Sequence, residues 1–317
     1  MVELTRPLIL DRIECQRTLT QRKALAEGAP LRWNDLLDRV THGRILSASA
    51  STMFAHGIHF GWHLRPSTIL AALLRRPLAY MCWGVAYHRG VRRRIARMVL
   101  RAADVVFVND ARTAEEVRAV AGVEAQRLPY MVDTEFFAFS ADAREDFLFC
   151  PGANDRDGDV LLGLARLGHK VVWLNNLPDL AARHAGLSPN LTIVAHPSFA
   201  DLRSLYRRCA AVVQPLTRDI HAAGQTTTLE ALACGAPVIL GTGRTAGMFA
   251  QADLVDVVAG RDSNAWSAAV ARALAREREN PSLAPARAAH IARHHAPEAV
   301  AARLVEGLNL VGQRRNG

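Results

Sequence analysis

The chain has 317 residues, about twice the commonest domain size, so two domains are the expected arrangement and one large α/β domain is the alternative. Half of the residues are hydrophobic and 6% are aromatic, a composition that excludes a disordered chain and a small disulfide scaffold. The net charge is +9, and between Asp38 and Asp104 there are eleven arginines and no carboxylate. This segment should attract phosphates, anionic lipids or nucleic acid, although a genome-wide base-composition bias would also enrich arginine.

The first hundred residues contain few clear elements. Helical periodicity covers 31–43 and 67–76, and short strands are predicted at 45–52 and 76–84. Only two or three strands precede residue 104, fewer than a full six-stranded Rossmann half requires. We therefore expect a short amino-terminal domain.

The segment 88–104 predicts a basic amphipathic helix. One face carries Val91, Ile95, Met98 and Val99, and much of the rest carries Arg92, Arg93, Arg94, Arg97 and Arg101. Such a helix is typical of membrane-surface elements, so we expect an anionic membrane surface to bind Arg92, Arg93, Arg94 and Arg97. The alternative is a helix whose apolar face is buried in the protein and whose arginines are solvated.

From about residue 104 the chain alternates short apolar runs with amphipathic stretches. Strands are predicted at 103–109, 125–137 (a short strand and a loop), 146–152, 169–175, 190–196, 210–216 and 236–242. Helices are predicted at 112–122, 157–168, 177–186, 199–209 and 227–235, and the tail from Ser263 is helical with a break at 280–285. Strands separated by helices of this length imply a parallel, doubly wound sheet.

Three parts are expected along the chain. Residues 1–143 would form an amino-terminal domain, residues 144–299 a carboxy-terminal ligand-binding domain, and residues 300–317 a terminal helix that can pack back on the first domain. Doubly wound sheets bind ligands where strands end and helices begin. The glycine- and polar-rich strand ends at 150–159 and 216–228 are therefore the places where we expect a site.

The stretch from Gly224 to Val238 reads GQTTTLEALACGAPV and carries the strongest site signal. A glycine and small hydroxyl residues stand just before a helix, so backbone N–H groups and the hydroxyls of Thr226 and Thr227 can point at one anion. Glu230 lies about one turn deeper, where it would accept hydrogen bonds from sugar or ribose hydroxyls. The alternative is an ordinary capped helix without a ligand.

This stretch resembles the retaining GT-B glycosyltransferases of the group 1 or family 4 type. Their carboxy-terminal domain carries a Glu, seven residues, a second Glu, an Ala/Met-rich helix and a Gly-x-Pro-Val turn; LEALACGAPVI is similar to the second half, with Glu230 at the second Glu. The segments 103–117, 128–137 and 151–162 also resemble family segments in the family's order. The resemblance covers about residues 100–260 and implies two Rossmann-like, doubly wound domains facing a central cleft.

The resemblance also assigns roles to residues. Arg156 would clamp the donor diphosphate through its planar guanidinium, and a surface arginine paired with Asp155 or Asp157 is the alternative. Gly152 and Asn154 would let the loop backbone approach the donor, and the base would rest near His196.

Two further positions depend on the family pattern. His88 would lie near the donor sugar, and an exposed histidine beside Arg89 is the alternative. The family's first Glu is replaced by Ala222, so His221 or Gln225 would supply polar contacts to the sugar instead.

The expected function is metal-independent transfer of a hexosyl group, with retention, from a nucleotide diphosphate sugar to a glycan or lipid-linked acceptor. No D-x-D or H-E-x-x-H motif is present, and no cofactor is expected. The alternatives are a glycosyltransferase-like scaffold that has lost catalysis, for which Ala222 argues, and a basic nucleic-acid-binding protein, which would not explain residues 224–238. Nucleic acid is not expected as a partner.

The expected location is the cytoplasm, with the inner face of the membrane as a peripheral site. The five cysteines are scattered and form no C-x-x-C pair, as in a reducing compartment. The amino terminus lacks a signal-peptide core, and no stretch reaches the ~18 uncharged apolar residues of a spanning helix.

Overall fold

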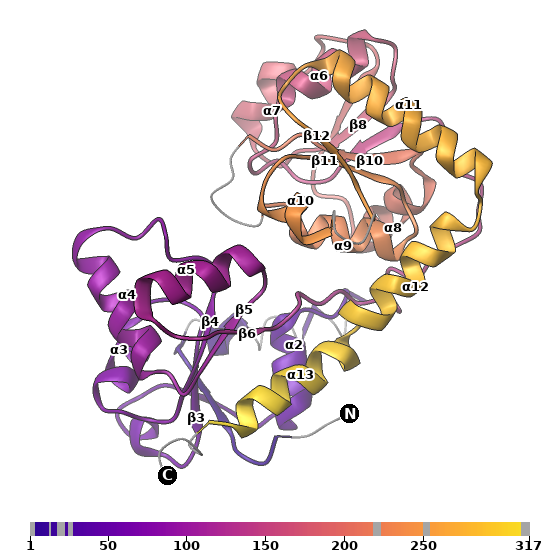
Figure 1. Ribbon diagram of the computed structural model, residues 1–317. Coiled ribbons are helices and arrows are strands. Elements are labelled where there is room, and N and C mark those ends of the chain that lie inside the picture. Colours follow the sequence, from indigo (N-terminus) through magenta and orange to yellow (C-terminus); the bar gives the residue numbers. More distant parts are fainter. Residues whose placement is uncertain are drawn as a thin grey trace. The chain divides into compact units, whose positions relative to one another are not determined.

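The computed structural model describes residues 4–12, 14–17, 23–24, 28–217, 223–249 and 254–311. The chain divides into two compact units (Figure 1). Unit 1 comprises residues 1–131 and 296–317, and unit 2 comprises residues 132–295. The dividing points differ from the expected ones at 143/144 and 299/300.

Unit 1 contains a parallel sheet of six strands in the order β2-β1-β3-β4-β5-β6. The strands are β1 (Leu8–Leu10), β2 (Ile45–Ser47), β3 (Ile58–Gly61), β4 (Leu78–Cys82), β5 (Val105–Val108) and β6 (Gln126–Arg127). Four of them precede residue 104, so the expectation of a short, strand-poor first domain is wrong. The strands that the sequence reading missed are β1 and β3, which are only three and four residues long.

Helices cover both faces of this sheet. They are α2 (Trp33–Thr41), α3 (Pro66–Leu73), α4 (Gly90–Ala102), α5 (Ala111–Ala121) and α13 (Pro297–Asn309), with a 3₁₀ turn η1 (Thr52–Phe54). Side chains of β4 alternate between two cores: Ala79 and Met81 pack with α2 and α13, whereas Leu78, Tyr80 and Cys82 pack with α3, α4 and α5. This alternation is the two-residue period of a strand that is buried on both faces.

Unit 2 contains a second parallel sheet of six strands in the order β12-β11-β10-β7-β8-β9. The strands are β7 (Leu148–Cys150), β8 (Val171–Leu174), β9 (Leu191–Val194), β10 (Ala211–Gln214), β11 (Val238–Gly241) and β12 (Asp256–Val258). The helices are α6 (Gly158–Arg166), α7 (Pro178–His184), α8 (Phe199–Arg208), α9 (Gln225–Ala233), α10 (Arg244–Phe249), α11 (Ser263–Glu279) and α12 (Leu283–His295). Every strand and helix predicted between 146 and 242 is confirmed, with small shifts of its ends.

Two half-buried arginines, Arg144 and Arg207, join the first residues of unit 2 to the end of α8. Arg144 donates through Nη1 to the carbonyl oxygens of Tyr206, Arg207 and Cys209, and Arg207 donates through Nε to the carbonyl of Ala138 at 2.9 Å. These bonds explain why residues 132–143 belong to unit 2.

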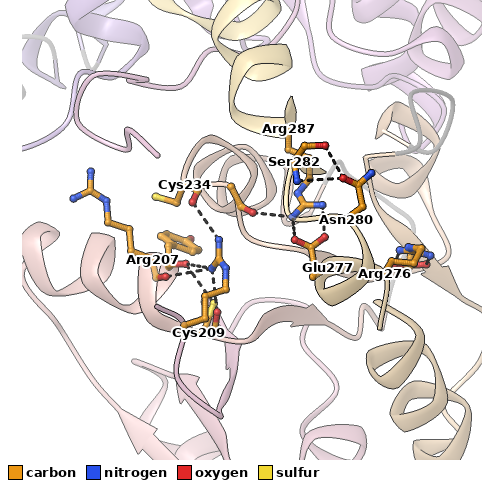
Figure 2. Close-up of polar contacts among 12 residues, drawn as sticks. Arg207, Cys209, Cys234, Arg276, Glu277, Asn280, Ser282 and Arg287 are labelled. Atoms are coloured by element: carbon orange, nitrogen blue, oxygen red, sulfur yellow. Dashed lines mark hydrogen bonds and ion pairs between the residues drawn. The ribbon is translucent and has the colours of Figure 1, made fainter. Parts of the chain in front are cut away.

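Another arginine, Arg287, stabilises the corner between α11 and α12. Arg287 pairs with Glu277 at 2.7 Å and donates to the carbonyl of Gly235 at 2.9 Å (Figure 2). Carbonyl groups at the end of a helix lack intrahelical partners, and a guanidinium satisfies them without adding a helical turn.

In each sheet the strand order reverses beside one strand. In unit 2 this strand is β7, which has β8 on one side and β10 on the other. Loops that leave neighbouring strands in opposite directions open a crevice at the carboxyl ends of the strands. Unit 2 therefore offers a crevice between the loops that follow β7 and β10. None of the described helices is long and apolar enough to span a bilayer.

Candidate active site

A cavity of about 530 Å³ lies at the carboxyl edge of the unit 2 sheet. Its walls come from the loops after four neighbouring strands: residues 152–156 after β7, Leu174 and Asn176 at the end of β8, four residues between His196 and Leu202 after β9, and residues 223–227 after β10. Of the predicted donor-site residues, the fold brings Gly152, Asn154, Arg156, His196, Gln225, Thr226 and Thr227 to this cavity.

Helix α9 points its amino terminus at the cavity. Its N-cap is Gly224, whose φ of +80° is a left-handed conformation that glycine adopts without a steric penalty. A Cβ atom there would collide with the Gln214 amide oxygen. Thr226 and Thr227 in the first turn line the cavity, and the first N–H groups of a helix carry partial positive charge.

Arg156 lies on the wall of the same cavity, with its Nη2 3.3 Å from the Thr227 hydroxyl in the first turn of α9, and is only 6% exposed. Its Nη1 donates to the carbonyl of Asn154 at 3.1 Å, and its Nη2 donates to the carbonyl of Pro151 at 3.1 Å and to Gln214 Oε1 at 2.8 Å. Asp157 does not pair with it; that carboxylate caps α6 and pairs with Arg261. The alternative of an exposed, ion-paired Arg156 is therefore wrong.

The buried guanidinium keeps an unbalanced charge. Among the described residues, its hydrogen-bond acceptors are carbonyl, amide and hydroxyl oxygens, and none is a carboxylate. A desolvated cation without a counterion attracts anions strongly, and the start of α9 adds to this field. Among the described residues of the cavity wall, Asp155 carries the only carboxylate. The arrangement can bind a phosphate or diphosphate.

The loop after β7 is shaped by Gly152 and anchored from β8. Gly152 has a φ of +83°, and its carbonyl accepts a hydrogen bond from Trp173 Nε1 at 3.0 Å. The neighbouring thiol of Cys150 is fully buried; burial raises its pKa to about 12, against the smaller opposing effect of Arg156. This thiol is therefore protonated at neutral pH and is not a nucleophile.

The third wall is suited to a flat, partly apolar group. His196 has a φ of +49°, and Pro197, Phe199 and Leu202 line the cavity beside it. Leu174 and Asn176 come from the end of β8, a strand end that the sequence reading did not select. Polarity alone could have indicated Asn176, which follows Asn175 directly after an apolar run.

The structure does not bring Glu230 to the cavity. Its side chain is 2% exposed, it is absent from the described cavity wall, and its carboxylate accepts a hydrogen bond from the Tyr206 hydroxyl at 2.9 Å. Position 230 lies more than a turn inside α9, on the side that packs against α8. Glu230 thus has a contact within the protein, and its expected contact with a ribose stays a prediction.

Three other positions have different outcomes. His88 belongs to unit 1 and is 6% exposed, with its ring against Tyr87; burial, followed by the charge of Arg92, lowers the pKa of its imidazole. The alternative of an exposed His88 is therefore wrong, and its place near a donor sugar stays a prediction. His221 and Ala222 lie outside the described residues.

Gln214 is a site residue that the sequence reading missed. It ends β10 and is fully buried, and its amide oxygen contacts both Arg156 and Thr227. The signal was available: a single amide stands at the end of the apolar run AAVV, immediately before Pro215.

Comparison with known proteins identifies this half of the chain. Residues 168–276 match the family model "Glycosyl transferases group 1". The matched segment lies within unit 2 and covers about a third of the chain. It includes the cavity walls after β8, β9 and β10, whereas the wall after β7, with Arg156, precedes it. No curated protein sequence matches the chain.

Solved structures show the same GT-B fold. HepE from Anabaena, crystallised with UDP, is 14% identical with a TM-score of 0.71, and the alignment covers 96% of this chain and 100% of that one. A glycosyltransferase from Rickettsia africae is 10% identical with a TM-score of 0.72, covering 97% and 99%. Sucrose-phosphate synthase from Thermosynechococcus elongatus is 17% identical with a TM-score of 0.67, covering 81% and 74%. At these identities the comparison concerns the fold of this chain and not its substrates.

Proposed function

We propose that this protein transfers a hexosyl group, with retention, from a nucleoside diphosphate sugar to a glycan or lipid-linked acceptor. The observation that carries the proposal is Arg156: a buried guanidinium lies on the cavity wall beside the amino terminus of α9, and its hydrogen-bond partners among the described residues are neutral. A diphosphate is the group that this field suits best.

The roles follow from the geometry. Arg156 and the first turn of α9, with the Thr226 and Thr227 hydroxyls, would hold the two phosphates and stabilise the charge that grows on the leaving diphosphate. The wall from His196 to Phe199 would hold the nucleoside base. The proposal includes independence from metal, since a fixed cation and a helix dipole already face the leaving group.

The choice of the first donor to test comes from the fold relatives. HepE has been crystallised with UDP and with UDP-glucose. UDP-sugars are therefore tested before GDP-sugars, with both nucleotides included because the cavity wall does not specify the base.

Binding of the diphosphate should depend on Arg156. We expect Arg156→Ala to lower the affinity for the nucleoside diphosphate about 10- to 100-fold, because hydrogen bonds to a charged group contribute about 1.5–3 kcal/mol. Isothermal titration calorimetry with UDP and GDP measures this. Arg272→Ala is the matched control, because Arg272 is exposed on α11. If Arg156→Ala bound as tightly as the control, the proposed site would be wrong.

A scaffold without catalysis is the second candidate, because Ala222 stands where the family keeps its first Glu. A scaffold would bind nucleotide and catalyse neither transfer to an acceptor nor donor hydrolysis. Incubation of the protein with radiolabelled UDP-glucose and an acceptor mixture, with and without chelator, separates the two functions and tests metal independence. Product formed only without chelator would contradict the metal-free mechanism.

The structure corrects the expected membrane element. In α4, Val99 is buried, and Ile95 and Met98 pack against the core of unit 1. Val91, the first residue of the expected apolar face, is 71% exposed, but the other three residues of that face are not available to lipid. The alternative of a buried stripe with solvated arginines describes those three.

We propose that α3 and α4 together bind an anionic membrane surface. On α3 and just after it, three leucines are 43%, 61% and 42% exposed: Leu70, Leu73 and Leu74. Leu73 shares a groove with four arginines, which are Arg75, Arg94, Arg97 and Arg101, while Arg92 and Arg93 are exposed on the same helix. Exposed apolar side chains beside arginines match a bilayer surface, where leucines enter the interface and arginines meet phosphates.

Vesicle sedimentation tests this surface. We expect the double variant Arg94→Ala, Arg97→Ala to bind vesicles containing phosphatidylglycerol about 30-fold more weakly, at about 1 kcal/mol per arginine. Arg272→Ala with Arg278→Ala in unit 2 changes the charge equally and serves as the control. Equal binding to neutral and anionic vesicles, or equal loss in both double variants, would refute the surface.

A further inference from the structure

A buried amide stands at the end of β10, where a parallel strand normally carries an apolar side chain. Gln214 is fully buried and follows Ala211, Val212 and Val213, which are also fully buried. Burying an amide costs free energy unless its oxygen and nitrogen are hydrogen-bonded. Its partners therefore indicate why it is there.

Both ends of this amide are bonded. The oxygen Oε1 accepts from Arg156 Nη2 at 2.8 Å and lies 3.0 Å from the Thr227 hydroxyl. The nitrogen Nε2 donates to the Thr228 hydroxyl at 3.1 Å, which fixes the direction of the amide plane. One side chain thus connects the loop after β7 to the first turn of α9.

We propose that Gln214 is a positioning residue that holds Arg156 and Thr227 in the geometry that binds the donor diphosphate. The inference rests on the proposed function of the cavity. It assigns the orientation of the phosphate-binding groups to a strand residue that is not on the described cavity wall.

The chemistry favours an amide over the other polar side chains. A carboxylate in this place would also hold the guanidinium, but it would cancel the positive charge that a diphosphate needs. A leucine would leave the positive charge of Arg156 intact, but it offers no acceptor for Nη2. The guanidinium would then lose one of the hydrogen bonds that fix its orientation. The amide oxygen orients Arg156 and leaves its net charge at +1.

Gly224 makes room for this contact. A Cβ atom at position 224 would collide with Gln214 Oε1 and would lie 3.3 Å from Arg156 Nη2. The glycine that caps α9 therefore also admits the amide between the helix and the arginine.

Two substitutions separate charge from shape. For Gln214→Glu we expect the melting temperature of the unliganded protein to be kept, because one oxygen can accept from Arg156 and the other from the Thr228 hydroxyl, while the Kd for UDP or GDP rises at least tenfold. For Gln214→Leu we expect a similar rise in the Kd for UDP or GDP. In both variants we expect the affinity for the nucleosides uridine and guanosine to stay within twofold of the wild type. A merely structural residue would weaken nucleoside and diphosphate binding together.

A double-mutant cycle tests whether the effect acts through Arg156. In the Arg156→Ala background, Gln214→Leu should raise the Kd for the diphosphate by a smaller factor than in the wild-type background, because only Thr227 is then left for it to position. Undiminished, additive losses would overturn the inference, as would unchanged diphosphate binding by Gln214→Glu and Gln214→Leu. Wild-type protein that binds neither UDP nor GDP would instead overturn the proposed function and, with it, this role for Gln214.

Discussion

Glu230 and Tyr206 form a buried polar pair inside unit 2. The Tyr206 hydroxyl donates to Glu230 Oε2 at 2.9 Å, and the rings of Phe137 and Phe149 pack edge-on against the tyrosine. Both partners are at most 2% exposed. A hydrogen bond from a hydroxyl to a buried carboxylate is charge-assisted, so it contributes more than an ordinary one. Glu230 thus supports the packing of α9 against α8.

Removing the hydroxyl should therefore affect stability and not ligand binding. We expect Tyr206→Phe to lower the free energy of unfolding by about 1.5–3 kcal/mol, measured by urea denaturation, because a hydrogen bond to a charged group is lost. The Kd for UDP or GDP should stay within twofold of the wild type. Glu230→Gln keeps an oxygen acceptor and should destabilise less. A loss of nucleotide affinity in Tyr206→Phe without loss of stability would instead support the ribose-binding role that the family pattern implies.

Among the elements, those of unit 2 between 146 and 242 could be predicted from local patterns alone, whereas α10 and β12 were not predicted. Asp157 accepts N–H groups at the start of α6, and Ser198 forms a capping box with Asp201 at the start of α8. These signals lie within four residues of the feature they mark, so a single sequence contains them. The glycine just beyond α9, Gly235, has a φ of +76° and ends the helix as expected.

The two strands of unit 1 that were not predicted, β1 and β3, depend on distant residues instead. In β1, Leu8 pairs with Ile45 on one side and with Ile58 of β3 on the other. A strand of three or four residues spans no more than two periods, so its pattern is not distinct from that of an apolar turn. Gly61 in β3 lowers the strand propensity further, yet a Cβ atom there would collide with Thr68. Its place is set by the packing of α3, which local sequence does not contain.

The residues of the candidate site also fall into two groups: those that local sequence patterns indicate and those that depend on distant contacts. Arg156 and Thr227 were predicted because each lies at a strand end or helix start. Gln214, which contacts both, lies 58 residues from Arg156 and 13 from Thr227. The contact exists only because β7 and β10 are neighbours in the sheet, and the strand order was not predicted.

At the scale of the whole molecule, the chain leaves unit 1 at residue 131 and returns to it at residue 296. The returning helix, α13, supplies Val300, Leu304, Val305 and Leu308 to the core of unit 1, and none of them is exposed. Because this core includes strand residues from the beginning of the chain, unit 1 cannot complete its fold before the last helix is available.

Gly307 lies where α13 packs tightly against Phe107 of β5 and Gln126 of β6. A Cβ atom there would lie 2.5 Å from Cε1 and Cζ of Phe107 and 2.6 Å from Gln126 Oε1. We expect Gly307→Ala to destabilise unit 1 by about 1–2 kcal/mol. Overpacking costs about 1–3 kcal/mol, which exceeds the gain in helix propensity of up to about 1 kcal/mol. Hydrogen exchange with mass spectrometry should then show faster exchange in the strands of unit 1 and unchanged exchange in unit 2.

The matched control is Gly247→Ala in α10, where a Cβ atom would meet nothing within 4 Å. There only the helix-propensity gain remains, so exchange in unit 2 should stay the same or slow. If Gly307→Ala were as well tolerated as Gly247→Ala, the close packing of α13 on Phe107 would be refuted. If both units exchanged faster in Gly307→Ala, the two units would unfold together as one cooperative body. The packing of α13 in unit 1 would then affect the stability of the cavity in unit 2.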